Sequence, residues 1–123
     1  MTDSEPIAQA LASFRTAAIA KGSGSQLPTR QDHALHAAMA HAVQVLRLAG
    51  APGTAALESL ARDPSPEVRA WASAELLSRG DAEMVPVVEE LAGLPGLLGF
   101  NASMVLQEYR AGRLGSPFGV AAP

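Results

Sequence analysis

Apolar residues recur along most of the chain at the three- and four-residue spacing of an α-helix. Ile7, Leu11, Phe14 and Ala18 fall on one narrow arc of a helical wheel, which predicts a helix over residues 5–21. Further apolar stripes, separated by glycine and proline, predict five more helices. We expect the helices to span residues 5–21, 30–49, 52–62, 66–79, 85–92 and 102–111.

Proline and glycine mark the ends of two of these helices. Ser65 followed by Pro66 predicts a cap and a first helical residue, and Gly80 predicts the end of the same helix. Pro86 lacks a backbone N–H and is tolerated in a first turn, so the next helix is expected to begin near residue 85.

Polar residues suggest caps for two other helices. Thr29, with Asp32 three positions later, resembles a capping box at the start of the second helix. Asn101 is expected to cap the last helix, and Phe100 before it is expected to pack on Val105 as a hydrophobic staple.

This element order predicts an all-α fold. Helices joined by short turns are expected to form about three antiparallel hairpins stacked side by side. We expect one domain over residues 1–112. Residues 113–123 carry no charge after Arg113 and no apolar periodicity, so they are expected to be a flexible tail or a segment draped over the surface.

Composition and charge narrow the possible functions. The 123 residues include no cysteine, which excludes disulfides, thiolate chemistry and Cys-ligated zinc. The start of the chain does not have the pattern of a secretory signal and no apolar run is long enough to span a bilayer, so we expect a cytoplasmic protein that does not bind membranes. Residues 58–90 carry eight acidic and three basic side chains, a net charge of −5. This excess is expected to repel nucleic acid and to attract a basic partner, or simply to solvate the surface.

The middle of the chain carries a repeat-like pattern. Val68, Ala72 and Leu76 follow one another at four-residue steps along one row, and Arg69 is placed to reach an acid such as Asp63 at a neighbouring turn. With its Val-Arg pair, the stretch from residue 52 to 93 resembles a HEAT-type repeat. Together with "LASFRTAAIA" and "NASMVLQEYRAG", it is similar to a family of small bacterial HEAT-like domains of unknown function. The resemblance implies a short right-handed solenoid and no reaction. The residues that carry it are Asp63, Val68, Arg69, Ala72, Leu76 and Pro86.

Trp71 is the single tryptophan of the chain and shares one helical strip with two acids, Glu67 and Glu75. In stacked hairpins the second helices line the concave side, so this strip is expected to face a groove. An exposed indole between carboxylates suits the centre of a protein-binding surface. The alternative is that Trp71 folds down as part of the rim of the core.

The leading hypothesis is therefore a non-enzymatic protein-binding module without cofactor or metal, a monomer or weak homodimer. The spacing of His33 and His36 is compatible with solvated histidines, and no further ligand is placed to complete a metal site. One alternative is an immunity-type protein that neutralises a basic bacterial toxin. Another is a nucleic-acid-binding helical-repeat protein, which would need its arginines, Arg15, Arg30, Arg47, Arg69 and Arg110, to converge. The expected partner-binding residues are Trp71, Glu67, Glu75, His33, His36, Arg47, Gln107 and Arg110.

Overall fold

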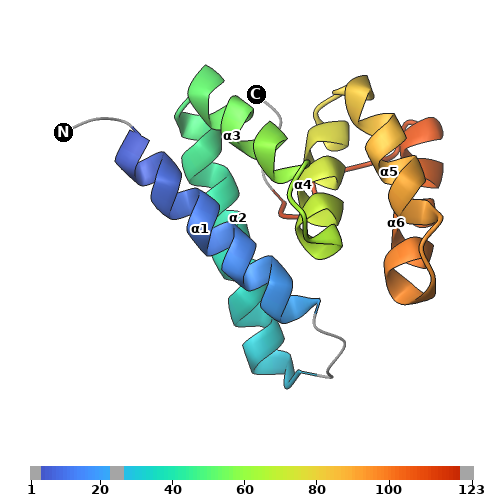
Figure 1. The fold of residues 1–123 in the computed structure, drawn as a ribbon, viewed down its shortest axis with the longest axis horizontal. Coiled ribbons are helices and arrows are strands. Elements are labelled where there is room, and N and C mark those ends of the chain that lie inside the picture. Colours follow the sequence, from blue (N-terminus) through green and yellow to red (C-terminus); the bar gives the residue numbers. More distant parts are fainter. Residues whose placement is uncertain (1–3, 23–26, 120–123) are drawn as a thin grey trace.

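The computed structural model of the protein describes residues 4–22 and 27–119, and their secondary structure is helical without strands. Within these two ranges the chain forms six α-helices, and one 3-10 turn, η1, precedes the fifth (Figure 1). Their bounds are α1 Ser4–Lys21, α2 Thr29–Leu48, α3 Ala51–Leu60, α4 Pro66–Ser78, η1 Ala82–Met84, α5 Val85–Ala92 and α6 Gly96–Arg110. The all-α prediction is confirmed for the described residues.

Helices α4 and α5 have nearly the predicted bounds, because proline and glycine fix their ends. Pro66 is the first residue of α4, and Gly80 follows its C-terminal end with a positive φ of 91°. A residue with a Cβ would be strained in this left-handed conformation, so glycine suits the end of the helix. Pro86 lies in the first turn of α5, where its missing N–H leaves no helical hydrogen bond unmade.

The predicted start of the last helix was wrong. α6 begins at Gly96, so Asn101 lies inside the helix and Phe100 is 60% exposed instead of acting as a staple. Gly99 explains the difference, since a Cβ at this position would lie 1.7 Å from the carbonyl oxygen of Leu94. This glycine allows a close approach of the backbone and does not interrupt the helix.

The predicted capping box of α2 was also wrong. Pro28 occupies the cap position, and no side chain caps the first turn. The carboxylate of Asp32 instead accepts a hydrogen bond of 2.6 Å from Lys21 Nζ at the end of α1. Asp32 therefore ties the two helices together across their connection.

Contacts between helices divide the molecule into two packed groups that meet at α4 (Figure 1). α1 and α2 lie side by side, and α3 packs on both of them. α5 and α6 form the other pair, and α4 contacts α1, α3, α5 and α6. Within the described residues the backbones of α2 and α4 do not come into contact, and the two helices meet through side chains such as His36 and Trp71. The space between these two helices is where the candidate site lies.

The core is built from the rows that the apolar pattern predicts. Val68, Ala72 and Leu76 are all buried along α4, and Phe14 of α1 is fully buried. Helices α2 and α3 approach closely, because a Cβ on Gly53 would lie 1.7 Å from the carbonyl oxygen of Leu46. None of the helices in the described ranges has the length and apolar character needed to cross a bilayer.

Arg69 lies at the expected turn but makes a different bond from the one expected. Its guanidinium donates to the backbone carbonyl oxygens of Asp63 and Pro64, at 2.9 and 3.0 Å. The carboxylate of Asp63 accepts from Arg15 Nε of α1 at 2.8 Å and from the backbone N–H of Ser65 at 2.9 Å. Arg69 therefore fastens the turn before α4 through its main chain, and Asp63 fastens the same turn to α1.

Candidate functional site

After α6 the chain returns across the molecule toward α2 and α4 (Figure 1). It ends this path in a turn, in which the N–H of Gly119 donates to the carbonyl oxygen of Ser116 at 3.2 Å. The N–H of Phe118 also donates to Ser116 Oγ at 3.2 Å. Pro117 and Gly119 suit this geometry, because proline fixes φ at the second position of a β-turn and Gly119 has a φ of 70°. The turn points the Phe118 ring into the protein, where it is 8% exposed.

Three rings from three parts of the chain surround Phe118. The centroid of its ring lies 5.7 Å from that of Phe14, 5.3 Å from that of His36 and 5.5 Å from that of Trp71. His36 and Trp71 also meet each other edge to face, with centroids 5.6 Å apart. Offset and edge-to-face pairs at these distances are favourable beyond the area that they bury. Phe118 thus adds a contact among α1, α2 and α4 at a place where the backbones of α2 and α4 do not approach each other and His36 meets Trp71 through side chains.

Two polar contacts fix the turn beside this cluster. His36 Nε2 donates to the carbonyl oxygen of Pro117 at 3.0 Å. Ser116 Oγ donates to the carboxylate of Glu75, whose other oxygen accepts from Arg79 Nε at 2.8 Å. Glu75 is 1% exposed, and these partners satisfy a charge that would be costly to bury alone. We call the surface formed by Phe14, His36, Trp71 and Glu75 the tail groove.

Lys21 lies at the edge of the tail groove. Its ammonium is 5.7 Å from the centroid of the Trp71 ring, within the range of a cation–π contact, and it also pairs with Asp32. The hydrogen bond from Lys21 is the main reason that the pKa of Asp32 lies below its ordinary value. The end of α1 and the start of α2 are thereby connected to the indole.

The structure brings together some of the predicted partner-binding residues. His36 and Trp71 face each other in the tail groove. Trp71 is partly buried, which is intermediate between the two alternatives of the sequence analysis, an exposed indole and a core residue. Glu75 differs from the exposed carboxylate that we expected, because the turn covers it. Glu67 is partly buried and accepts from Ser65 Oγ at 2.9 Å, and His33 is exposed on α2.

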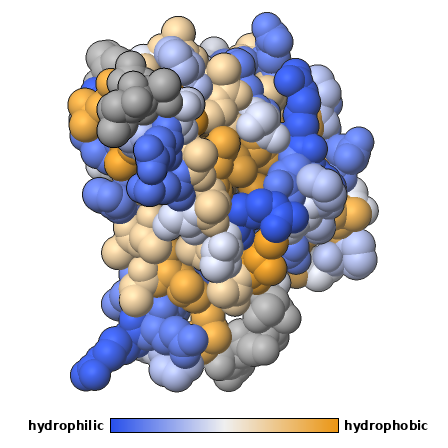
Figure 2. Space-filling view, turned by 60° about the vertical axis from the view of Figure 1, so that its left-hand side comes forward, coloured by the Kyte–Doolittle hydropathy of each residue, from blue (hydrophilic) through white to orange (hydrophobic). Residues whose placement is uncertain are grey.

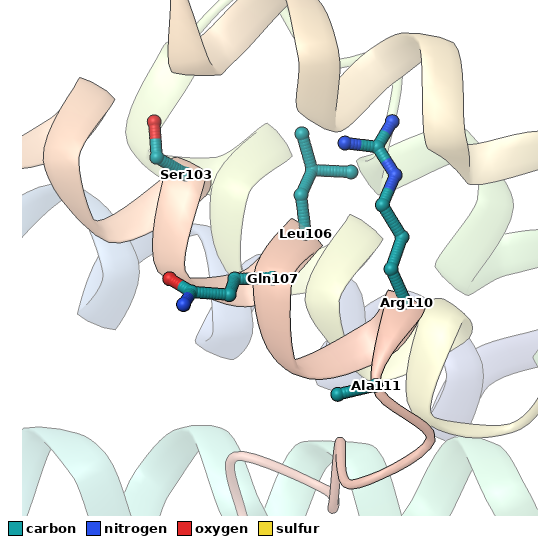
Figure 3. Close-up of a pocket in the computed structure, with 5 residues that line it drawn as sticks. All are labelled: Ser103, Leu106, Gln107, Arg110 and Ala111. Carbon is teal, nitrogen blue, oxygen red and sulfur yellow. The ribbon is translucent and has the colours of Figure 1, made fainter.

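The remaining predicted residues lie elsewhere. Arg47 is in the last turn of α2, where its buried Nε has no hydrogen-bond partner among the described residues. Gln107 and Arg110 line an open cavity of about 520 Å³ on α6 (Figure 3). Arg110 also donates to Glu89 of α5 at 2.9 Å. The other lining residues are Ser103, Leu106 and Ala111.

Sequence reasoning missed the residues that fill the tail groove. Ser116, Pro117 and Phe118 were assigned to a flexible tail, whereas Phe118 belongs to the core. Residues 120–123 of that predicted tail lie outside the described residues. The missed signal is the tetrapeptide Ser-Pro-Phe-Gly, which has serine, proline and glycine at the positions that a β-turn favours. If this tetrapeptide had been interpreted as a turn, its aromatic side chain would have been predicted to be buried.

A second surface is apolar and open. Leu97, Phe100 and Met104 recur along one side of α6 and are 76%, 60% and 41% exposed. Figure 2 shows a different face, with the left-hand side of Figure 1 turned forward, where apolar patches also lie between hydrophilic residues. Large exposed side chains at helical spacing are typical of contact surfaces.

Three of the eight acids in residues 58–90 form ion pairs. Asp63 pairs with Arg15 of α1, Glu75 with Arg79, and Glu89 with Arg110. Two of these arginines come from outside the acidic stretch. In the folded protein they therefore neutralise part of its excess negative charge. Within the described residues, no group of three or more histidine or acidic side chains lies together in a way that could hold a metal ion.

The comparisons with known proteins add no relative. The chain matches no family model, no curated protein and no solved structure.

Proposed function

We propose that this protein is a non-enzymatic protein-binding module, a short HEAT-like stack of helical hairpins that binds a partner at the tail groove. The observation that supports it is the way this groove holds a non-helical segment of polypeptide. Aromatic rings take up the Phe118 side chain, while His36 and Glu75 bond to the main chain and hydroxyl beside it. Tryptophan is prominent in binding hot spots, and buried aromatic anchors flanked by hydrogen bonds are typical of interface centres.

The charges weigh against the two alternatives. Three of the arginines that a nucleic-acid binder would use are already engaged, Arg15 with Asp63, Arg110 with Glu89, and Arg69 with backbone carbonyls. The same ion pairs weaken the acidic surface on which an immunity-type protein would attract a basic toxin. The proposal therefore depends on shape and aromatic contacts more than on net charge.

The test uses a photo-crosslinking amino acid in the full chain, expressed in its native cells. Placed at His33, which is exposed one turn before His36, it should form an adduct with a specific protein. The matched control is Thr16, which is exposed on α1 at about 200° around the helix from Phe14. Crosslinks at both positions to the same set of proteins would indicate random collisions and contradict the proposal.

The captured protein is then purified, and its Kd for the native chain is measured by calorimetry. His36→Ala removes a ring and a hydrogen-bond donor from the tail groove and should weaken binding at least about tenfold. Thr16→Ala serves as the control and should leave the Kd unchanged. An unaltered Kd for His36→Ala would show that the partner binds elsewhere.

A further inference from the structure

Residues 116–119 have the features of a preformed ligand. Pro117 restricts the backbone at the second position of the turn, and Gly119, with a φ of 70°, occupies the fourth position, where glycine is favoured. Ser116 Oγ accepts from the N–H of Phe118, which holds the turn closed from inside. Because the turn is largely built by its own residues, little conformational entropy is lost when it docks.

The tail groove contacts each of the first three turn residues differently. The carboxylate of Glu75 binds the Ser116 hydroxyl, and His36 binds the carbonyl oxygen of Pro117. The ring of Phe118 contacts Trp71 and Phe14 as well as His36. A groove with these groups favours a hydroxyl residue at the first position and an aromatic residue at the third. The bond from His36 goes to a backbone carbonyl oxygen, so the preference for proline comes from the shape of the turn.

The connection between α6 and the turn is rich in glycine. It contains Gly112, with a φ of 74°, and Gly115. Arg113 is held at the end of α6 by hydrogen bonds to Glu108, which lie outside the tail groove. The turn follows the end of α6 at Arg110 and belongs to no helix, and His36 and Glu75 hold it through their side chains.

Resting on the proposed function, we propose that the tail groove recognises a β-turn of the type Ser-Pro-aromatic-Gly in a partner protein. Residues 116–119 are the intramolecular copy of this ligand. A turn of the partner binds only when it displaces residues 116–119, so this segment competes with the partner for the tail groove. The apparent affinity of the partner is reduced by the fraction of molecules whose groove is closed.

The experiment measures binding of a fluorescein-labelled synthetic peptide of residues 112–123 to the full-length protein, by fluorescence anisotropy. The native chain and the Phe118→Ala chain are compared, and circular dichroism confirms that both are folded. In Phe118→Ala the internal turn loses its anchor, so this chain should bind the peptide at least about tenfold more tightly than the native chain. Phe100→Ala, which alters an exposed phenylalanine, is the matched control and should behave as the native chain.

Peptide variants test the recognition itself. On the Phe118→Ala chain, a peptide with alanine in place of its phenylalanine should bind at least about tenfold more weakly, and one with alanine in place of its serine should also lose affinity. A folded Phe118→Ala chain that binds no peptide would overturn the proposal. Equal binding of the original and the phenylalanine-free peptide would do the same.

A second variant and a second measurement cover the case in which Phe118→Ala does not fold. Ser116→Ala removes the bond to Glu75 and keeps the ring, and it should bind the peptide about threefold or more tightly than the native chain. Hydrogen exchange on the native chain should show the amides of residues 114–119 opening well before those of α4. Equal protection of the two segments would mean that the turn is a permanent part of the core, and the proposal would be wrong.

These results separate the two proposals. If a crosslinked partner requires His36 for binding but the peptide does not bind, the protein-binding function is supported. The proposal that the groove recognises a turn is then rejected. If the peptide binds but no protein is crosslinked at His33, the groove recognises the turn, and its ligand is the chain's own segment and not a partner protein.

Discussion

Replacing Phe118 by alanine is the most informative perturbation of this structure. Although Phe118 lies near the end of the chain, it is 8% exposed and touches rings from α1, α2 and α4. Because the backbones of α2 and α4 do not approach each other, the ring adds packing between them beside the contact of His36 with Trp71. We therefore expect Phe118→Ala to cause a large loss of stability. The same substitution in a frayed terminus would cause none.

The expected magnitude follows from the burial of the ring. Truncation of a buried phenylalanine to alanine costs about 3 to 5 kcal/mol, which includes the cavity left behind. The segment that carries Phe118 can detach instead of holding a cavity open, which limits the loss, so we expect about 2 to 4 kcal/mol. In a domain of this size, this corresponds to a decrease in Tm of roughly 6 to 20 °C.

The assay is thermal unfolding followed by far-UV circular dichroism, with urea unfolding as a second measure. Phe100→Ala is the matched control, because Phe100 is 60% exposed and its loss should change stability by less than about 0.5 kcal/mol. A Tm for Phe118→Ala within about 2 °C of the native value would refute the reasoning. It would show that the ring does not occupy the tail groove in solution.

Three further predictions concern single contacts. Ser116→Ala leaves one oxygen of a buried carboxylate without its donor, and should lower the free energy of unfolding by about 1 to 2 kcal/mol in urea titrations; no change would mean that water replaces the hydroxyl. Gly53→Ala would place a Cβ 1.7 Å from the Leu46 carbonyl oxygen, and should destabilise by about 1 to 3 kcal/mol despite the higher helix propensity of alanine; a stabilised variant would contradict the close approach. The pKa of Asp32 is lowered in the folded state by Lys21, so the stability lost in Asp32→Asn should be constant from pH 7 to 5 and disappear as the pH falls below about 4. A difference that grows in acid, measured by urea unfolding at each pH, would exclude this pairing.

Much of the fold could be predicted from local residues. Pro66, Gly80 and Pro86 act within one turn of their own positions, so α4 and α5 were placed to within a residue. The start of α6 was missed because a glycine in the sequence looks like a helix break. Gly99 is instead required by a tertiary contact, the close approach of the helix to a backbone carbonyl. Asp32 was misread for a similar reason, since its partner Lys21 lies in another helix.

The candidate site was predicted only in part. The helical strip set Trp71 apart from the buried row of α4, and Trp71 is partly buried, but Glu75 on the same strip is buried. Periodicity within a helix cannot show what covers the strip. The covering residues, Ser116 to Phe118, lie more than forty positions along the chain from Trp71. Their burial depends on where α6 ends and how the chain turns back, which are tertiary facts.

The central claim is that Phe118 lies among the rings of Phe14, His36 and Trp71, and nuclear Overhauser spectroscopy on the native protein tests it most directly. Ring centroids 5.3 to 5.7 Å apart should give cross-peaks between the Phe118 ring protons and the protons of these three rings. Absence of all three cross-peaks, with residues 114–119 at random-coil chemical shifts, would contradict the account.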